Sequence, residues 1–152
     1  MIEWQWCTLD DLSARQVYAV LAVRGAVFVV EQNCVYGDID GLDLDAMHLI
    51  GWSGTEAAAY TRVLAPGASF AEPSIGRVLT AQTFRSSGLG RELFAKSIAH
   101  TEALYPGQNI RIGAQAHLQR FYGSFGFVRA SEDYIEDGIV HVEMLRRAGI
   151  RE

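Results

Sequence analysis

The stretch Arg85-Ser86-Ser87-Gly88-Leu89-Gly90 is the most informative part of the sequence about the fold, because a strand pattern precedes it and a helix pattern follows it. Residues Ile75–Thr80 (IGRVLT) form a short apolar run with β-branched members, which is typical of a buried strand. After the glycines, apolar residues recur at helical spacing towards Leu104: Leu89, Leu93, Phe94 and Ile98. We therefore predict a strand, a glycine-containing turn and a helix in direct succession.

The turn itself has the properties of an anion site. The first N–H groups of a helix have no partner within the helix, and the positive end of the helix dipole lies beside them. Gly88 and Gly90 lack a Cβ, so a ligand can approach the backbone closely, and Arg85 adds a fixed positive charge. This pattern predicts a phosphate-binding turn. A glycine turn without a ligand is the alternative, because a single glycine motif is weak support for binding.

The composition indicates one globular domain spanning residues 1–152. Apolar residues make up 49% and charged residues 20% of the chain, which excludes a disordered protein. A net charge of -5 argues against nucleic acid or a membrane surface as the main partner, and no apolar run is long enough to span a bilayer. Cys7 and Cys34 match no metal or redox spacing and indicate a reducing compartment. We therefore expect a cytoplasmic protein without a bound metal.

The remaining segments place this strand–turn–helix unit in a larger α/β domain. Alternating residues 2–7 predict a first strand, and a capping box at Ser13–Gln16 begins a helix. We expect this helix to break or turn between Gly25 and Asn33, because glycine and the β-branched residues that follow it are poor helix formers. Two strands before the central unit, a strand and a short helix after it, and a final Asp137-Gly138 hairpin complete the order. This order predicts a mixed sheet rather than a repeated βαβ fold.

Four aspartates stand close together in a loop that follows the first helix: Asp38, Asp40, Asp43 and Asp45. The loop lacks the glycine and glutamate spacing of an EF-hand, so a calcium site is not predicted. A solvated acidic loop is one interpretation of these residues. A surface that binds a cationic amine is the other, and the sequence leaves both open.

A second motif, Phe121-Tyr122-Gly123-Ser124-Phe125-Gly126-Phe127, follows the phosphate turn by one helix and one strand. Aromatic residues at helical spacing before a glycine are compatible with core packing alone. Together, however, the R-x-x-G-x-G and F-Y-x-x-x-G-F motifs resemble those of the GNAT superfamily of acetyl-CoA-dependent N-acyltransferases, and the element order agrees over the whole domain. Further segments resemble the ElaA-type branch of that superfamily: Met1–Trp4, Val27–Cys34, Asp38–Gly41, Ile75–Val78, Gly113–Gln119 and Glu136–Ile139.

The resemblance implies an α+β fold of the GNAT type, with a mixed but mostly antiparallel sheet of six to seven strands and about four flanking helices. It also implies acetyl-CoA as the cosubstrate. Backbone groups of the central strand should bind the pantetheine arm and the thioester carbonyl: Val78, Leu79 and Thr80. N–H groups of the turn should hold the pyrophosphate: Arg85, Ser86, Ser87, Gly88, Leu89, Gly90 and Arg91. Gln115 stands where many members have an asparagine that contacts the cofactor.

Tyr122 stands where the family places a hydroxyl against the thioester sulfur. Acyl transfer releases a thiolate whose conjugate acid has a pKa of about 8.5, so a tyrosine hydroxyl can protonate it or donate a hydrogen bond to it. The attacking amine must be neutral, and a general base would supply that form. Glu31 is the leading candidate for the base, and three histidines remain open alternatives: His48, His117 and His141.

The sequence therefore predicts an N-acetyltransferase that moves an acetyl group directly to a primary amine in a ternary complex, since neither cysteine stands in a nucleophile setting. A non-catalytic acyl-CoA sensor on the same fold is the alternative, and Tyr122 favours the enzyme. The expected acceptor is a small amine or a peptide amine. The sequence does not identify it, and a homodimer is left open.

Overall fold

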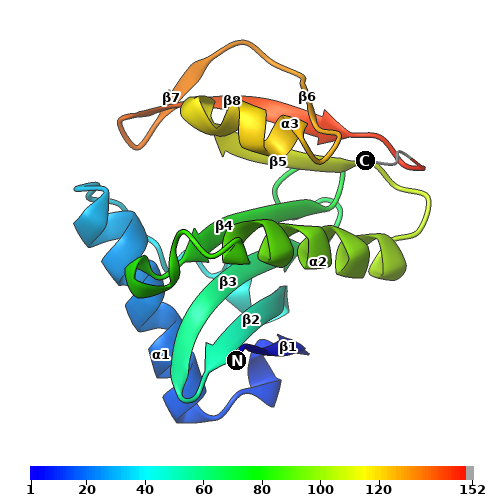
Figure 1. Ribbon diagram of the computed structural model, residues 1–152. Helices are drawn as coiled ribbons and strands as arrows, with labels where there is room; N and C mark the ends of the chain where they lie inside the picture. Colours follow the sequence, from blue (N-terminus) through cyan, green and yellow to red (C-terminus); the bar gives the residue numbers. More distant parts are fainter. Residues whose placement is uncertain (150–152) are drawn as a thin grey trace.

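The computed structural model describes residues 1–149, which form two sheets connected by helix α2 (Leu89–Leu104) (Figure 1). Sheet A has the order β1-β2-β3-β4, and its strands are β1 (Glu3–Thr8), β2 (Met47–Ser53), β3 (Glu56–Leu64) and β4 (Ser74–Thr80). Sheet B has the order β5-β8-β6, with β7 also paired to β8, and its strands are β5 (Ile110–Gln115), β6 (Val128–Arg129), β7 (Tyr134–Glu136) and β8 (Ile139–Arg146). Each strand pairing within the described residues is antiparallel.

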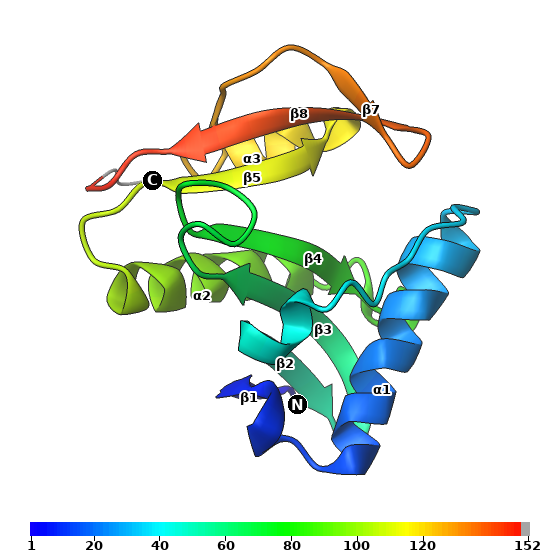
Figure 2. The same cartoon turned by 180° about the vertical axis from the view of Figure 1, so that it is seen from behind.

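The helices cover both faces of sheet A and one face of sheet B. Residues 1–149 contain three α-helices, namely α1 (Ala14–Arg24), α2 and α3 (Gln119–Gly123). Short 3-10 turns occupy Leu9–Asp11, Leu42–Asp45, Gln82–Phe84 and Ala116–Leu118. Helices α1 and α2 pack on opposite faces of sheet A (Figures 1 and 2), because neighbouring residues of a strand point to opposite sides. Thus Ile50 of β2 lies in the apolar cluster beneath α1, and Leu49 lies in the cluster beneath α2.

The predicted fold class, α+β with mostly antiparallel strands, is confirmed, and two details differ. The described chain has eight strands in two sheets and three α-helices, rather than six to seven strands in one mixed sheet with about four helices. The sheets are separate because β4 and β5, which run in the same direction, diverge along their length (Figure 2). One backbone hydrogen bond, from the N–H of Arg111 to the carbonyl of Pro73 (3.1 Å), joins the two strands where they begin.

Helix α1 begins at the predicted capping box and continues as a π-helix within the segment where we expect a break or turn. The Ser13 hydroxyl accepts a hydrogen bond from the Gln16 N–H (3.1 Å), and Gln16 Oε1 accepts one from the Ser13 N–H (2.9 Å), which confirms the capping box. The predicted break or turn between Gly25 and Asn33 takes the form of a change of helix type followed by the helix end. Gly25 keeps helical dihedral angles (φ -62°, ψ -43°), and a π-helix, η2 (Gly25–Glu31), continues α1 as far as Glu31. Asn33, with a φ of 50°, lies just beyond its end.

Strand β4 contains a β-bulge at its centre. The pairing register with β3 shifts by one residue between Tyr60 and Arg62, so that Arg77 and Val78 together stand opposite Thr61. Arg77 has a φ of 50°, a left-handed conformation that a non-glycine residue keeps only when its surroundings hold it there. The bulge bends β4 at the point where it separates from β5.

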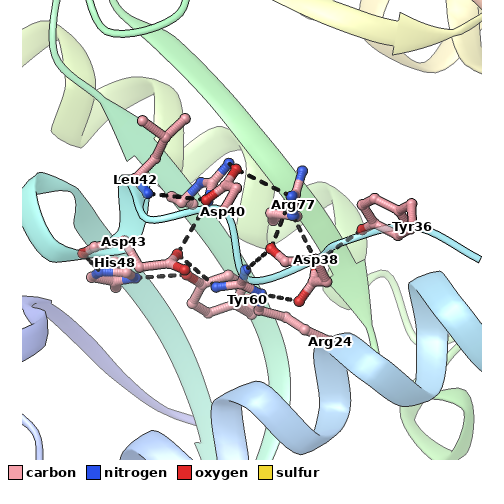
Figure 3. A network of polar contacts seen from close by, with 10 residues as sticks. Arg24, Tyr36, Asp38, Asp40, Leu42, Asp43, His48, Tyr60 and Arg77 are labelled. Carbon is pink, nitrogen blue, oxygen red and sulfur yellow. Dashed lines mark hydrogen bonds and ion pairs between the residues drawn. The ribbon is translucent and has the colours of Figure 1, made fainter. Parts of the chain in front are cut away.

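A buried network of ion pairs holds Arg77 and the acidic loop in place (Figure 3). It joins three arginines to three aspartates: Arg24, Arg62 and Arg77 to Asp38, Asp40 and Asp43. Arg24, which is 0% exposed, bonds Asp38 (2.9 Å) and Asp43 (2.6 Å). Arg77 bonds Asp38 (2.8 Å), and its guanidinium lies 5.4 Å from the centre of the Tyr36 ring. The network therefore connects α1, the loop, β3 and the bulge of β4.

These contacts correct both interpretations of the acidic loop. Asp38 and Asp43 are buried, so they are not solvated, whereas Asp45 is exposed as the solvated interpretation requires. Burial would raise the pKa of Asp43, but the bonds from Arg24 and Arg62 outweigh it and lower this pKa, so the carboxylate stays ionised. Because the three buried or half-buried carboxylates already bond arginines, they are not free to bind a cationic acceptor.

His48 joins the network as a neutral imidazole. Its Nε2 lies 3.0 Å from the carbonyl oxygen of Asp43, which can only accept, so Nε2 carries the proton. Its Nδ1 then accepts a hydrogen bond from the Tyr60 hydroxyl (2.6 Å). Burial lowers the pKa of His48. Since both ring nitrogens are engaged within the core, the geometry speaks against His48 as the general base.

The network gives a prediction for stability. We expect Asp43→Asn to lower the free energy of unfolding by about 3–5 kcal/mol. The substitution removes one carboxylate from the buried Arg24 and Arg62, which then have only Asp38 and Asp40 as partners. Denaturant unfolding measures this change. Asp45→Asn, in the same loop but exposed, is the matched control and should change stability by less than about 0.5 kcal/mol. Equal effects of the two substitutions would contradict the structure.

The burial of His48 gives a second prediction. A histidine whose pKa is lowered on folding takes up its proton first in the unfolded chain, so stability should decrease as the pH falls below about 6.5. The lowered pKa values of Asp40 and Asp43 extend the loss below about pH 4, where the unfolded carboxylates become protonated. We expect His48→Gln to reduce the slope between pH 5 and 6.5 by up to about 1.4 kcal/mol per pH unit. An unaltered slope in His48→Gln would show that this residue is not the buried neutral group.

Candidate active site

A cavity of about 250 Å³ lies between the two sheets, where β4 and β5 diverge. The bulge of β4 forms one wall, with Gly76, Arg77 and Val78, and β5 forms the opposite wall. Tyr122 of α3, the β7–β8 hairpin and the segment that follows η2 complete the lining. The cavity therefore collects residues from both halves of the chain.

Strand β4 presents free backbone groups along this opening. The N–H of Ala81 donates to the carbonyl of Ala58 in β3 (2.8 Å). Because backbone groups alternate along an antiparallel strand, those of Leu79 also point to β3, while those of Val78 and Thr80 point to the open side. The Thr80 carbonyl accepts a hydrogen bond from Arg85 Nε on this side (3.1 Å). Of the three strand residues that we expect to bind a cofactor, Val78 and Thr80 thus direct backbone groups away from β3, and the Thr80 carbonyl is already bound to Arg85.

The phosphate turn lies at the end of β4, and its geometry is that of an anion site. Gly88 is the N-cap of α2 with a φ of 79°, and the N–H of Glu92 makes the first intrahelical bond, to the carbonyl of Gly88 (3.2 Å). The N–H groups of Leu89, Gly90 and Arg91 therefore have no partner within the helix. Apart from neighbouring residues of the turn and the helix backbone, a methyl group at Gly88 would meet no described residue within 4 Å, and one at Gly90 would meet only the Thr80 methyl group at 3.9 Å. The space over these groups is open.

The polar side chains of the turn are directed to protein partners. Ser87 Oγ donates to the carbonyl of Phe84 (3.0 Å), and Arg91 donates to Ser124 Oγ (3.1 Å) while its guanidinium lies 4.8 Å from the centre of the Phe125 ring. Ser86 has a φ of 69°, so the turn is sharp at this position. The backbone of the turn, rather than these side chains, is thus left for a ligand.

Glu31 lies at the phosphate turn rather than in the cavity beside Tyr122. Its Oε1 accepts a hydrogen bond from Arg85 Nη2 (2.8 Å), and this pairing lowers the pKa of Glu31. A carboxylate with a lowered pKa is a weaker base, and this one is already bound to a guanidinium. The geometry therefore speaks against Glu31 as the general base and makes it the counter-ion of Arg85.

Tyr122 has the environment of a neutral hydroxyl group. The residue is 7% exposed and packs against Phe94 and Phe121, whose ring centres lie 5.1 Å and 5.2 Å away. Burial raises the pKa of Tyr122 to about 12, so the hydroxyl keeps its proton at neutral pH. Within residues 1–149 it makes no hydrogen bond, and it lines the cavity. A hydroxyl in this setting can donate to a ligand.

Gln115 is the last residue of β5 and lines the cavity. Its amide nitrogen donates to Gln32 Oε1 at 3.3 Å, so the side chain bridges from sheet B to the residue that follows η2. The contact depends on where η2 ends, because Gln32 directly follows it. Gln115 thus lies beside the opening where a cofactor is expected, although its amide is engaged with the protein.

The cavity is also lined by residues other than those predicted to bind acetyl-CoA, and one of them is His141, which the sequence leaves open as the general base. Four of them come from the β7–β8 hairpin and one from the segment after η2: Tyr134, Glu136, Asp137, His141 and Cys34. The Asp137-Gly138 signal predicts the hairpin correctly. The alternation of His141 with Glu143 gives them a common face, but no sequence signal says that the hairpin folds over the opening between β4 and β5. His117, another alternative for the base, is exposed and is not part of this lining.

No group of three or more His, Cys, Asp or Glu side chains in residues 1–149 is arranged to hold a metal ion. No helix within the same residues has the length and apolar character needed to cross a bilayer.

The chain is similar over nearly its whole length to proteins of one family. A model of the acetyltransferase (GNAT) domain matches residues 9–147. Protein ElaA from Escherichia coli (strain K12) is 46% identical over 148 residues, which cover 96% of this chain and 97% of that protein. The crystal structure of Escherichia coli ElaA superposes with a TM-score of 0.90 at 45% identity, covering 97% of this chain and 100% of that one.

A second solved structure, described as an acyl-CoA N-acyltransferase from Pseudomonas aeruginosa, has a TM-score of 0.91 at 40% identity and covers 96% of this chain and 99% of that one. The separated strands, the glycine turn at the start of α2 and the aromatic helix α3 thus occur in a chain whose sequence matches one family model from residue 9 to residue 147. On these grounds the protein belongs to the GNAT acetyltransferase family.

Proposed function

We propose that the protein is an acetyl-CoA-dependent N-acetyltransferase that transfers the acetyl group to a primary amine by direct attack in a ternary complex. The observation that carries the proposal is the course of β4, which leads from the cavity at its bulge to the open N–H groups at the start of α2. A ligand with a diphosphate at one end and a reactive group at the other matches this arrangement.

The residues along this path fit the parts of acetyl-CoA. The free N–H groups of Leu89, Gly90 and Arg91 suit the pyrophosphate, because they combine unpaired donors with the positive end of the helix dipole. The backbone groups of Val78 and Thr80 suit the amides of the pantetheine arm. Acetyl-CoA supplies an acetyl group activated as a thioester.

The protein groups at the cavity suit acyl transfer. A backbone N–H on the bulge of β4 can stabilise the negative charge that develops on the carbonyl oxygen. Tyr122 can donate a hydrogen bond to the departing sulfur. Because the pKa of Tyr122 is about 12 and that of the thiol is about 8.5, complete proton transfer from the hydroxyl is unfavourable, and stabilisation of the thiolate by the hydrogen bond is its main role.

Two observations favour direct attack over a covalent intermediate. The Cys34 thiol lines the cavity, but it donates a hydrogen bond to the carbonyl of Asp137 (3.1 Å) rather than to a base. Cys7 is buried in the core beneath α1. Both thiols are unpaired, which supports the predicted cytoplasmic location.

A non-catalytic acyl-CoA sensor remains the second candidate, and Tyr122 distinguishes the two. A sensor has no need of a hydroxyl that lines the cavity without a protein partner, whereas an acyltransferase uses it for the leaving group. The acceptor is a small amine or a peptide amine in this proposal. The loop aspartates do not select it, since they are bound to arginines.

Substitution of Gly90 tests the phosphate site. We expect Gly90→Ala to weaken acetyl-CoA binding at least tenfold in calorimetric titration, because a Cβ would occupy the space over the N–H groups without a close contact to the protein. Gly25→Ala adds the same methyl group to a helical position that also has free space, and it should bind as the wild type does. If Gly90→Ala also bound acetyl-CoA normally, the turn would not be the pyrophosphate site.

Substitution of Tyr122 separates the enzyme from the sensor. We expect Tyr122→Phe to lower the rate of acetyl transfer about 10²-fold while the Kd for acetyl-CoA changes less than about twofold, because the hydroxyl acts only on the departing sulfur. Release of free thiol in the presence of a panel of primary amines measures the rate. Acetyl-CoA binding by the wild type without transfer to any amine of the panel would favour the sensor.

A further inference from the structure

His141 is one of the polar residues that line the cavity. It lies on β8, directly opposite Gln115 of β5 and Tyr134 of β7, so the three side chains form a row across one face of sheet B. All three line the cavity, and His141 is buried. The Tyr134 ring stacks on the imidazole, with 5.8 Å between the ring centres and 26° between the planes. The imidazole therefore has a defined orientation.

The backbone decides which nitrogen of His141 carries the proton. Nδ1 lies 2.8 Å from the carbonyl oxygen of Ile139, which can only accept, so Nδ1 is the donor. In the neutral ring, Nε2 then has a free lone pair. This nitrogen lies 3.8 Å from Oε2 of Glu136, a distance too long for a direct hydrogen bond.

An amine nitrogen fits between His141 Nε2 and Glu136 Oε2. A nitrogen placed about 2.8 Å from both atoms completes a triangle whose third side is the observed 3.8 Å. A primary ammonium has three N–H donors, so it can donate to a carboxylate oxygen and an imidazole nitrogen at the same time. Glu136 lies on the rim, with its side chain 60% exposed, where an arriving cation meets it first.

The charge of the cavity favours the same ligand. The cations in its wall, Arg62 and Arg77, are neutralised by the aspartates of the loop network. Glu136 and Asp137 also line the cavity, and neither has an arginine or lysine partner among residues 1–149. The uncompensated charge of the described lining is therefore negative, which attracts a cationic acceptor.

We propose that Glu136 and His141 form the acceptor site, in which the Glu136 carboxylate binds the ammonium group of a primary amine and His141 Nε2 takes its proton. This assignment rests on the proposed acetyltransferase function and names its general base. The ammonium gives one proton to His141, and the neutral amine forms the C–N bond as the C–S bond breaks. The second proton of the nitrogen ends on the thiolate, and the imidazolium releases its proton to water.

His141 and Tyr122 reach the cavity from different faces of sheet B. Ala114 and Val142 point to the face on which Tyr122 packs, whereas Gln115 and His141 point to the other face. Because β5 is the edge strand of sheet B, the cavity extends around it, and both residues line it. An amine bound at His141 and a thioester beside Tyr122 therefore share one cavity, in which the nitrogen attacks the carbonyl carbon that carries the sulfur.

The first test needs neither acceptor nor cosubstrate. Proton–nitrogen correlation spectra of the imidazole side chains should show one neutral histidine protonated at Nδ1 whose signals disappear in His141→Gln. A neutral His141 protonated at Nε2 would overturn the proposal, because its lone pair would then point away from Glu136. This outcome leaves acetyl-CoA binding, and thus the proposed function, untouched.

The second test uses three primary amines as probes: phenethylamine, spermidine and lysine amide. With the amine that the wild type acetylates fastest, we expect His141→Ala to lower kcat about 10²-fold at an unchanged Kd for acetyl-CoA, and added imidazole to restore part of the rate. Glu136→Gln should instead raise the KM for the amine about tenfold. His100→Gln on α2 and the exposed Glu132→Gln are the matched controls, and both should act as the wild type does.

The outcomes separate this proposal from the proposed function. Acetyl transfer by the wild type that is equally fast in His141→Ala and Glu136→Gln would overturn the acceptor site while the enzyme assignment stands. Loss of rate in His141→Ala without any rescue by imidazole, in a protein with wild-type acetyl-CoA affinity, would also overturn the role of His141 as base. If the wild type binds acetyl-CoA but acetylates none of the three amines, the proposal of a primary-amine acceptor fails together with the enzyme assignment.

Discussion

The ion pair between Arg77 and Asp38 stabilises the β-bulge of β4, and this bulge forms one wall of the cavity. Arg77 keeps a left-handed backbone conformation in the middle of β4, which costs on the order of 1–3 kcal/mol unless its surroundings enforce it. Its guanidinium is held by Asp38 (2.8 Å) and stacks on Tyr36, and Asp38 is held in turn by the fully buried Arg24. The bulge is thus stabilised by α1 and the acidic loop, which fix the position of the Arg77 side chain.

This arrangement explains why so much charge is buried beside the cavity. Three arginines and three aspartates balance one another there. The desolvation of such groups offsets most of their attraction, so their effect on total stability is small compared with their effect on geometry. An apolar cluster would fill the same space without specifying the position of Arg77. Because the network carries no net charge, Glu136 and Asp137 determine the sign of the electric field in the cavity.

The two halves of the site have different structural origins. The phosphate turn is local, since the helix N-terminus, Gly88 and Gly90 lie within a few residues of one another. The cavity is assembled from both sheets, from α3 and from the segment after η2. Gln32 bridges to Gln115 and Glu31 bridges to Arg85, so the end of the first helix contacts both halves. A ligand that displaces Glu31 from Arg85 would free the guanidinium for its own phosphates.

Features that depend on neighbouring residues could be predicted from the sequence alone. The capping box at Ser13, the strand, glycine turn and helix of the phosphate site, and the Asp137-Gly138 hairpin all follow from local rules of capping, turn geometry and periodicity. The helical conformation of Gly25, the burial of Asp38 and Asp43, and the partners of Glu31 and His141 could not be predicted in this way. These properties arise from groups far apart in the chain, such as the pairing of Arg24 with Asp43 and of Glu31 with Arg85. Local propensity cannot supply them, because the energy of a buried charge is set by the partner that the fold brings to it.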